Sequence, residues 1–397
     1  EAALLESLKK PITLYCGFDP TAPSLHTGNL VVLLVLRRFQ LAGHNPIALV
    51  GGATGLVGDP SGKNEERTLN STEIVEGWVN RIRQQVSAFL DFDAPKNPAL
   101  VVNNLDWTSP LSAIEFLRDI GKHFSVNQML SKDSVSARLE GGGISYTEFS
   151  YQVLQSYDFL ELYRRNNCTL QVGGSDQWGN IVAGLDLIRR VEQGSGHALT
   201  VPLLMKADGT KFGKTAGGSV WLDPEMTSPY AFFQFWLNSD DKDVINFLKV
   251  FSFKSHDEIK ELEKSHNENP GLREAHRALA RELTALVHSE ETTQRVEAAA
   301  RALFGQGELA ELDEATLASA LAELPRTTIS AQEEIPTWVD LLAATGVVDS
   351  KSAARRIVKE GGAYLNNEKI SGEDFRPSKT DFLCGKYAVL RKGKRDL

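Results

Sequence analysis

Short apolar segments alternate with longer segments of helical period over the first half of the chain. Runs rich in apolar residues predict strands at residues 12–18, 46–51, 100–103, 169–173 and 199–204. Between them, apolar positions recur with helical spacing, which predicts helices at residues 30–42, 73–92, 111–124, 148–164 and 180–191. This alternation predicts an α/β fold, a parallel sheet with helices on both faces. Such sheets bind ligands at the carboxyl ends of their strands, so functional residues are expected directly after the strands.

The strand signals stop near residue 226, and the rest of the chain predicts other modules. Residues 227–304 are rich in helical periods and predict a helical domain. Residues 305–335 are acidic and rich in Ala and end in a Ser/Gln/Glu/Pro stretch, which is typical of a linker. Residues 336–397 predict a small α+β domain, with a helix at 351–359 and short strands near 363–365 and 387–390.

The composition is that of a soluble globular protein, with 42% hydrophobic and 24% charged residues in a chain of 397. No apolar run reaches the roughly 18 residues of a membrane span, and residues 1–14 show no secretory or transit pattern. The chain starts without Met, so some N-terminal residues are expected to be missing. We therefore expect a cytoplasmic protein.

The cysteines and histidines predict no metal centre. The three cysteines, Cys16, Cys168 and Cys384, lie far apart, which favours a reducing compartment and argues against a disulfide framework or a Cys-based zinc site. The eight histidines include no HExxH pair. A structural metal is therefore not expected.

The net charge of −9 is distributed unevenly. Residues 351–397 hold 12 Lys and Arg against 6 Asp and Glu, a net charge of +6, whereas the remainder has 31 basic and 46 acidic residues, a net of −15. A basic segment in an otherwise acidic chain predicts that one module binds phosphate groups while the rest of the chain has a different function.

Residues 15–29 contain Gly, Asp and His after the first predicted strand, and a helix is expected to start at Gly28–Asn29. A helix N-terminus presents free N–H groups and a partial positive charge, which suits a nucleotide phosphate. His26, just before it, can donate a hydrogen bond to a phosphoryl oxygen. The alternative is an ordinary turn between a strand and a helix, with an incidental histidine.

Residues 51–63 form a Gly-rich segment after the second strand. It fails the Walker pattern, because Val57 replaces the first glycine and Asn64 replaces Ser or Thr, so a P-loop NTPase is excluded. What remains is a carboxylate, Asp59, followed by Lys63 and Arg67, groups that suit an ammonium and a polyphosphate. A solvated loop is the alternative.

In the predicted helix 148–164, Tyr151, Gln155 and Asp158 fall at i, i+4 and i+7, on one face. The neighbouring apolar residues predict that this helix is buried, and buried polar groups need partners. One polar ligand can satisfy all three. An internal hydrogen-bond network without a ligand is the alternative.

Two further segments follow the last two strands. In residues 171–180, glycines permit close approach of a nucleotide, and Asp176 can accept hydrogen bonds from ribose hydroxyls. In Lys211-Phe-Gly-Lys-Thr215, two lysines flanked by glycines predict a mobile lid that brings positive charge to a phosphoryl group. Each segment alone is equally compatible with a turn or a solvated loop.

Together these segments resemble the class I aminoacyl-tRNA synthetases, and among them the bacterial-type tyrosyl-tRNA synthetases, from about Tyr15 to the C-terminus. His26-Thr-Gly-Asn29 is similar to the HIGH signature, and Lys211-Phe-Gly-Lys-Thr215 to the KMSKS signature. The polar residues of helix 148–164 and the run from Gly173 to Asn180 resemble the tyrosine-specific enzymes.

The resemblance implies a Rossmann-like catalytic domain at 1–226, a helical anticodon-region domain at 227–304, a linker at 305–335 and an S4-like RNA-binding domain at 336–397. It implies ATP with Mg²⁺ as a substrate complex, and L-tyrosine and tRNA(Tyr) as the other substrates. It also implies a homodimer that is not associated with a membrane.

The resemblance also implies roles for single residues. The phenol hydroxyl of tyrosine would be held by Tyr15 and Asp158. Its ammonium group would be held by Asp59, Tyr151 and Gln155, and its carboxylate side by Gln177. The residues that would face ATP are Gly17, Asp19, Gly28, Gly174, Asp176 and Lys214. The catalytic groups that would stabilise the phosphates are His26, Asn29, Lys63, Arg67, Lys211, Lys214 and Thr215.

The first signature departs from the family pattern at two positions, where Thr27 replaces Ile and Asn29 replaces the second His. An Asn amide still donates hydrogen bonds, so activity is expected to persist. Two rival functions stay open. A tryptophanyl-tRNA synthetase is disfavoured because Tyr15 and Asp158 suit a phenol. A non-catalytic RNA-binding protein on the same scaffold is disfavoured because all the proposed cationic groups are present.

Overall fold

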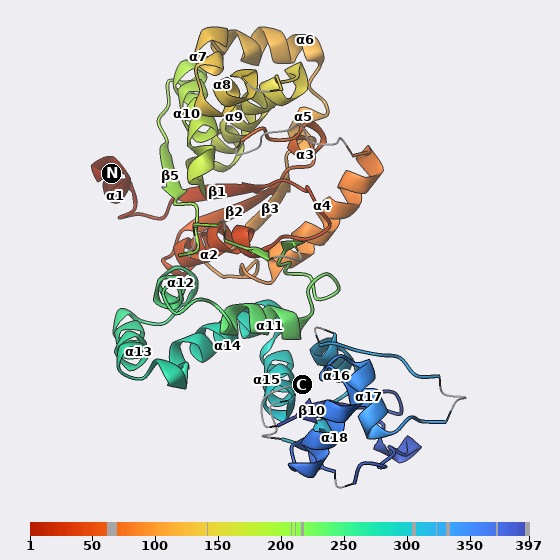
Figure 1. Ribbon diagram of the computed structural model, residues 1–397. Helices are drawn as coiled ribbons and strands as arrows, with labels where there is room; N and C mark the ends of the chain where they lie inside the picture. Colours follow the sequence, from red (N-terminus) through yellow and green to blue (C-terminus); the bar gives the residue numbers. More distant parts are fainter. Residues whose placement is uncertain are drawn as a thin grey trace. The chain divides into compact units, whose positions relative to one another are not determined.

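The computed structural model describes residues 1–61, 70–140, 142–207, 209–210, 212–215, 218–303, 307–322, 324–330, 334–370 and 372–393 (Figure 1). For Lys214 and Thr215 it describes the backbone alone. The chain divides into two compact units. The first comprises Glu1–Met226 and Asp240–Ile259, and the second comprises Thr227–Ser239 and Lys260–Leu397.

A five-stranded parallel sheet forms the centre of the first unit, in the order β3-β2-β1-β4-β5. Its strands are β1 (Thr13–Phe18), β2 (Asn45–Val50), β3 (Leu100–Asn103), β4 (Cys168–Gly174) and β5 (His197–Val201). The predicted α/β fold is confirmed. The strand order reverses between β1 and β4, which is the position where such sheets form a ligand crevice.

Long helices cover this sheet. They are α2 (Thr27–Leu41), α4 (Thr72–Ser87), α9 (Tyr146–Asn166) and α10 (Trp178–Glu192). Figure 1 shows α9 and α10 above the sheet and α2 below it. Buried apolar side chains such as Leu49, Phe159 and Leu187 belong to one core that joins the sheet to α9 and α10. Burying these faces stabilises the unit by about 25 cal/mol for each Å² of apolar surface removed from water.

The shorter elements of the first unit are α1 (Ala2–Ser7), α3 (Thr54–Val57), α5 (Leu105–Thr108), α6 (Ala113–Glu115), α7 (Val126–Leu130), α8 (Asp133–Glu140), α12 (Val244–Phe251), β6 (Lys214–Thr215) and β7 (Gly218–Ser219). Several predicted bounds differ from the structure, and the helix predicted at 73–92, for example, ends at Ser87. The predicted helix 111–124 is broken, because a π-helical turn at Phe116–Ile120 and a 3₁₀ turn at Gly121–His123 follow α6. The predicted strand 199–204 ends at Val201, because Pro202 has no N–H to donate to a ladder.

The second unit consists of helices and a small sheet. Its helices are α11 (Pro229–Leu237), α13 (His256–Glu268, whose first turn belongs to the first unit), α14 (Glu274–His288), α15 (Glu290–Leu303), α16 (Glu314–Leu321), α17 (Trp338–Ala344) and α18 (Lys351–Lys359). The strands β8 (Ala363–Leu365), β9 (Glu368–Lys369) and β10 (Leu390–Lys392) pair antiparallel in the order β10-β8-β9.

The C-terminal part of this unit has a core of its own, formed by Trp338, Leu342, Ile357 and other apolar side chains. The predicted helix 351–359 is confirmed, whereas the last strand starts at Leu390 rather than near residue 387. The division into three domains and a linker stays a prediction. The boundary at residue 226 agrees with the first unit, but residues 240–259 join that unit rather than the helices around them.

Candidate active site

A cavity of about 450 Å³ lies in the first unit, where β1 and β4 end. The predicted site residues that line it are Tyr15, Gly17, Asp19, His26, Gly28, Asn29, Asp59, Tyr151, Gln155, Asp158, Gly174, Asp176 and Gln177. They come from separate segments between β1 and the start of α10, and the fold brings them to one place. Lys63, Arg67 and Lys211 lie outside the described residues.

Asp158 lies on α9 and is 3% exposed. Its two carboxylate oxygens accept hydrogen bonds from Asn104 Nδ2 at 2.9 Å and from Trp107 Nε1 at 2.8 Å. Burial raises the pKa of Asp158 to about 7, although the two hydrogen bonds act to lower it. The carboxylate is therefore oriented by fixed donors before any ligand arrives.

Tyr15 lies on β1 and is 1% exposed. Among the residues that the structure describes, no group forms a hydrogen bond with its hydroxyl. Burial raises the pKa of Tyr15 well above its ordinary value, and the charge of Asp158 raises it further. A buried hydroxyl without a partner costs roughly 1–3 kcal/mol, so a ligand that supplies a polar group here would relieve that cost.

Gln171 pairs with Tyr15 across the sheet, since the two residues are opposite each other in β4 and β1. It is buried, lines the cavity, and its Oε1 has no hydrogen-bond partner within the described part of the chain. The sequence analysis missed Gln171, Asn104 and Trp107. A polar residue inside an apolar strand, and polar residues directly after β3, were the signals that could have identified them.

The other predicted residues of the cavity already bond to one another. Tyr151 donates its hydroxyl to Asp19 Oδ2 at 2.6 Å, and Thr54 donates to Asp19 Oδ1 at 2.6 Å. Burial, followed by the charge of Asp19, raises the pKa of Tyr151 well above its ordinary value. Gln155 accepts from Asn180 Nδ2 at 3.1 Å. The polar face of α9 thus has an internal network, the arrangement left open as the alternative to a ligand.

Asp59 is held from two sides. Its Oδ1 accepts from the Ser61 backbone N–H at 2.9 Å, and its Oδ2 accepts from Gln177 Nε2 at 2.7 Å. The same Gln177 nitrogen lies 3.3 Å from Asp176 Oδ2. Two carboxylates therefore share one neutral amide donor, an arrangement that favours the approach of a cationic group.

The N-terminus of α2 has a reciprocal cap. His26 Nδ1 accepts from the Gly28 N–H at 3.0 Å, and Asn29 Oδ1 accepts from the His26 N–H at 3.1 Å. A Cβ on Gly28 would lie 2.7 Å from His26 Cε1, so glycine is needed for the ring to keep this position. Asn29, which departs from the family pattern, thus caps the helix in the way that Glu or Gln does in a capping box.

The second signature lies beside the first. The Thr27 N–H donates to the Val220 carbonyl at 2.9 Å, and His26 pairs with Trp221 in an isolated bridge. The backbone of Lys214 and Thr215 forms β6, which pairs with β7. The structure therefore brings the segment around His26 together with residues 212–215 and 218–221 at one helix N-terminus.

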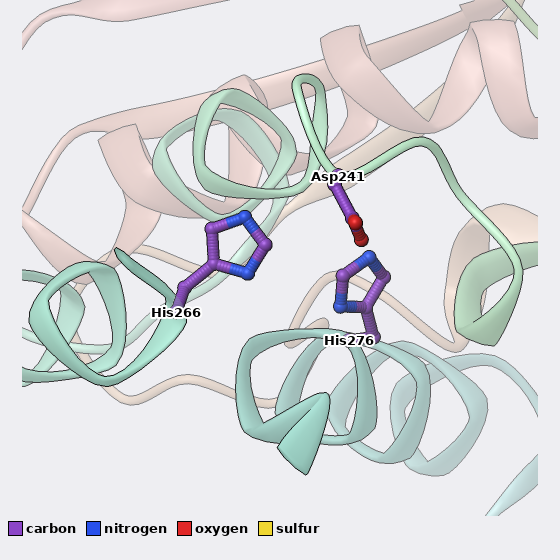
Figure 2. A group of neighbouring side chains, drawn as sticks. All are labelled: Asp241, His266 and His276. Carbon is purple, nitrogen blue, oxygen red and sulfur yellow. The ribbon is translucent and has the colours of Figure 1, made fainter. Parts of the chain in front are cut away.

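In the second unit, the imidazole rings of His266 and His276 lie with their centroids 5.6 Å apart. Figure 2 shows the two rings, together with Asp241 of the first unit. His276 is buried, and its Nε2 lies 3.2 Å from the Ser239 carbonyl. Separately, none of the described helices is both long and apolar enough to cross a membrane.

Comparison with known proteins assigns the class. The model of the family "tRNA synthetases class I (W and Y)" matches residues 6–305, and the chain belongs to this family. The resemblance to class I synthetases is thereby confirmed. Residues 316–397 match the "Tyrosine--tRNA ligase SYY-like C-terminal domain".

The relatives point to one member of the class. A protein of Streptomyces avermitilis named Tyrosine--tRNA ligase is 63% identical over 98% of this chain and 91% of its own. Another of that name, from Streptomyces coelicolor, is 63% identical over 100% of this chain and 94% of its own. A solved C-terminally truncated mitochondrial tyrosyl-tRNA synthetase of Aspergillus nidulans is similar with a TM-score of 0.68 and 29% identity, over 76% of this chain and 89% of that one.

Proposed function

We propose that this chain is a tyrosine–tRNA ligase. It activates L-tyrosine with ATP, which gives tyrosyl-adenylate and pyrophosphate, and transfers the tyrosine to the 3′ end of tRNA(Tyr). The two Streptomyces relatives with this named activity support the assignment. The structural observation that carries it is the buried Tyr15 hydroxyl without a partner within the described residues, next to an Asp158 carboxylate held by two donors.

A phenol fits this end of the cavity better than the alternatives. Its hydroxyl can accept from Tyr15, which has no other partner among the described residues, and donate a further hydrogen bond to Asp158. Phenylalanine would leave the buried Tyr15 hydroxyl without a partner, at a cost of roughly 1–3 kcal/mol. An indole carries one N–H donor and no acceptor, so it cannot serve Tyr15 and Asp158 together.

The ammonium group of the substrate fits at the carboxylates. Asp59 lies beside Asp176, with Gln177 between them, while Gln155 and Tyr151 line the same cavity. A cation here gains charge-assisted hydrogen bonds, which are about twice as strong as neutral ones. The substrate carboxylate would then lie towards Gln177 and α2, where the nucleotide is expected.

Adenylate formation needs no covalent intermediate with the protein. A tyrosine carboxylate oxygen attacks the α-phosphorus of ATP in line. The bond between the α-phosphorus and the oxygen that bridges to the β-phosphate breaks, and pyrophosphate leaves with the bonding electron pair. Mg²⁺ enters as part of the ATP complex. The N-terminus of α2, with His26 and Asn29, offers donors to phosphoryl oxygens. Lys63, Arg67, Lys211, Lys214 and Thr215 stay proposed as groups that stabilise the leaving pyrophosphate.

The tRNA is proposed to meet the C-terminal part of the second unit. Helix α18 carries Lys351, Arg355, Arg356 and Lys359, all exposed. Each of them lies within 4 Å of a carboxylate of Asp340, Glu360 or Glu373, so phosphates would have to replace these weak surface partners. We propose an S4-like RNA-binding role for this module.

We also propose a cytoplasmic homodimer. Large apolar side chains are exposed on α6, on α7 and in the first turn of α9: Ile114 at 69%, Val126 at 58% and Tyr146 at 70%. Contiguous exposed apolar patches mark surfaces that associate with other chains, and the dimer proposal assigns these side chains to such a patch. Tyr146→Asp is expected to shift the mass measured by light scattering from dimer to monomer. A monomeric wild-type protein would rule the dimer out.

Tyrosine-dependent ATP–pyrophosphate exchange tests the function. We expect exchange with tyrosine and none with tryptophan or phenylalanine at equal concentration. Exchange with tryptophan would favour the tryptophanyl enzyme of the same family. A protein that binds RNA and shows no exchange with any amino acid would favour the non-catalytic alternative.

A further inference from the structure

Phe212, between the two signature lysines, packs on α12. Its side chain is 8% exposed, and its ring centroid lies 4.9 Å from that of Phe247 and 5.3 Å from that of Phe251. Both partners are themselves buried. An aromatic residue within a lysine-bearing, glycine-rich segment would ordinarily be solvated. Here it is part of an aromatic cluster.

Helix α12 holds this segment at a second point and is itself fixed to α2. Asp243, at the N-terminus of α12, accepts a hydrogen bond from the Ala207 N–H at 3.0 Å. At the other end, Arg38 of α2 donates to the Val250 and Ser252 carbonyls at 2.8 and 2.9 Å. These contacts explain why residues 240–259 belong to the first unit. They connect the lysine segment to the helix whose N-terminus carries His26.

The residue after Phe212 lies directly on that N-terminus. A Cβ on Gly213 would be 2.9 Å from Thr27 Oγ1 and 3.4 Å from the Gly28 nitrogen. The φ of Gly213 is +83°, a conformation that favours glycine. Its carbonyl accepts from the Val220 N–H at 3.2 Å, and Val220 in turn accepts from Thr27. A shift of Phe212 would therefore move the backbone that touches the phosphate-facing end of α2.

We propose that Phe212 is a positioning residue for the ATP-dependent step. Its ring, held by Phe247 and Phe251, fixes where the backbone of residues 212–215 lies relative to the N-terminus of α2. The lysines would supply the charge, and the aromatic contact would decide where that charge is placed. This inference rests on the proposed function, because it concerns the nucleotide of the same reaction.

Steady-state pyrophosphate exchange tests the role, with ATP and tyrosine varied separately. Phe212→Ala is expected to lower kcat/KM for ATP on the order of 10²-fold, since a misplacement of about 1 Å can cost that much. The KM for tyrosine should change by less than about twofold, because the ring contacts of Phe212 are with Phe247 and Phe251 of α12. Phe212→Leu, which keeps the apolar contact, is expected to fall between alanine and wild type.

Phe89→Ala is the matched control, since Phe89, which follows α4 in the same unit, is also buried and is not among the residues that line the cavity. It should lose stability and keep its ATP kinetics. Phe247→Ala should repeat the effect of Phe212→Ala, and the double variant should be no worse than Phe212→Ala alone, because contacting residues are not additive. If an alanine variant does not fold, Phe212→Leu is compared with Phe89→Leu.

Equal ATP kinetics in the Phe212 and Phe89 variants would overturn the inference. So would a rise in the KM for tyrosine as large as that for ATP, since this would show general damage to the unit. A wild-type protein without tyrosine-dependent exchange would instead refute the proposed function, and the two failures are thereby distinguished.

Discussion

Asp158 has both carboxylate oxygens occupied by Asn104 and Trp107, whereas the Tyr15 hydroxyl has no partner among the residues described. At the residue scale, this difference distinguishes residues that position another side chain from a residue that can bind the ligand. Asn104 and Trp107 orient a carboxylate, and Tyr15 leaves a hydrogen bond to be made. The polar spacing of Tyr151, Gln155 and Asp158 predicted a buried polar stripe on one helix, but it could not predict which atoms would remain unsatisfied.

The indole N–H of Trp107 can be removed with little change of shape. Trp107→Phe keeps an aromatic ring beneath Arg165, whose guanidinium carbon lies 5.5 Å from the Trp107 ring centroid. A hydrogen bond to a charged group contributes about 1.5–3 kcal/mol. We expect kcat/KM for tyrosine in pyrophosphate exchange to fall by roughly tenfold to 100-fold, with the KM for ATP unchanged. An unchanged tyrosine kcat/KM would show that Trp107 does not orient Asp158.

Burial of Asp158 also makes stability depend on pH. An unfolded Asp ionises near pH 3.9, whereas the pKa of Asp158 in the folded protein is raised to about 7. Between these values the folded protein binds more protons than the unfolded chain. The contribution of this carboxyl to stability is therefore fully present below about pH 4 and lost as the pH rises to about 7.

Asp158→Asn should remove that loss. In the absence of tyrosine, the Tm of the variant minus the Tm of the wild type should increase between about pH 5 and about pH 8. Asp106→Asn, an exposed residue of α5, is the control and should show a constant difference. A constant difference for Asp158→Asn as well would mean that the folded carboxyl ionises at its ordinary pKa.

At the scale of elements, the N-terminus of α2 depends on a glycine. In Gly28→Ala the new Cβ would lie 2.7 Å from His26 Cε1, so the ring would have to leave its cap. We expect about 1 kcal/mol lower stability and an adenylate formation rate lower on the order of 10²-fold. Rapid-mixing measurement of pyrophosphate release checks the rate.

Gly77→Ala provides the comparison for Gly28→Ala. A Cβ on Gly77 in α4 would meet no atom within 4 Å, so this variant should gain up to about 1 kcal/mol and keep its activity. Similar behaviour of the two variants would show that the His26 cap has no part in the reaction.

Element boundaries were predicted best where the signal was local. The helix at 351–359 and the strand β3 occur as predicted, because their periods and flanking turns lie in the same short stretch. The predicted helix 111–124 shows the limit. Its apolar period is that of a helix, yet the backbone forms successive α, π and 3₁₀ turns. Periodicity alone does not distinguish these hydrogen-bond patterns.

At the scale of the whole molecule, activation and transfer are expected to separate. Deleting residues 337–397 should reduce aminoacylation much more than tyrosine-dependent pyrophosphate exchange, because the cavity lies within the first unit. tRNA affinity should also fall steeply with salt, and the deletion should make that dependence shallower. Equal losses in exchange and aminoacylation would contradict this division of tasks.

The sequence by itself determined the α/β class, the family and thirteen of the residues that line the cavity, because strand–helix alternation and short motifs after strands are local patterns. Only the tertiary structure decided which polar atoms face one another. Asn104 and Trp107 reach Asp158 from more than fifty positions away, and Gln171 becomes relevant through its sheet register with Tyr15. The packing of Phe212 on Phe247 and Phe251 of α12 is likewise a contact between segments that are distant in the sequence. Hydrogen bonds and aromatic contacts between distant segments depend on how the elements pack, which the period of a single segment does not specify.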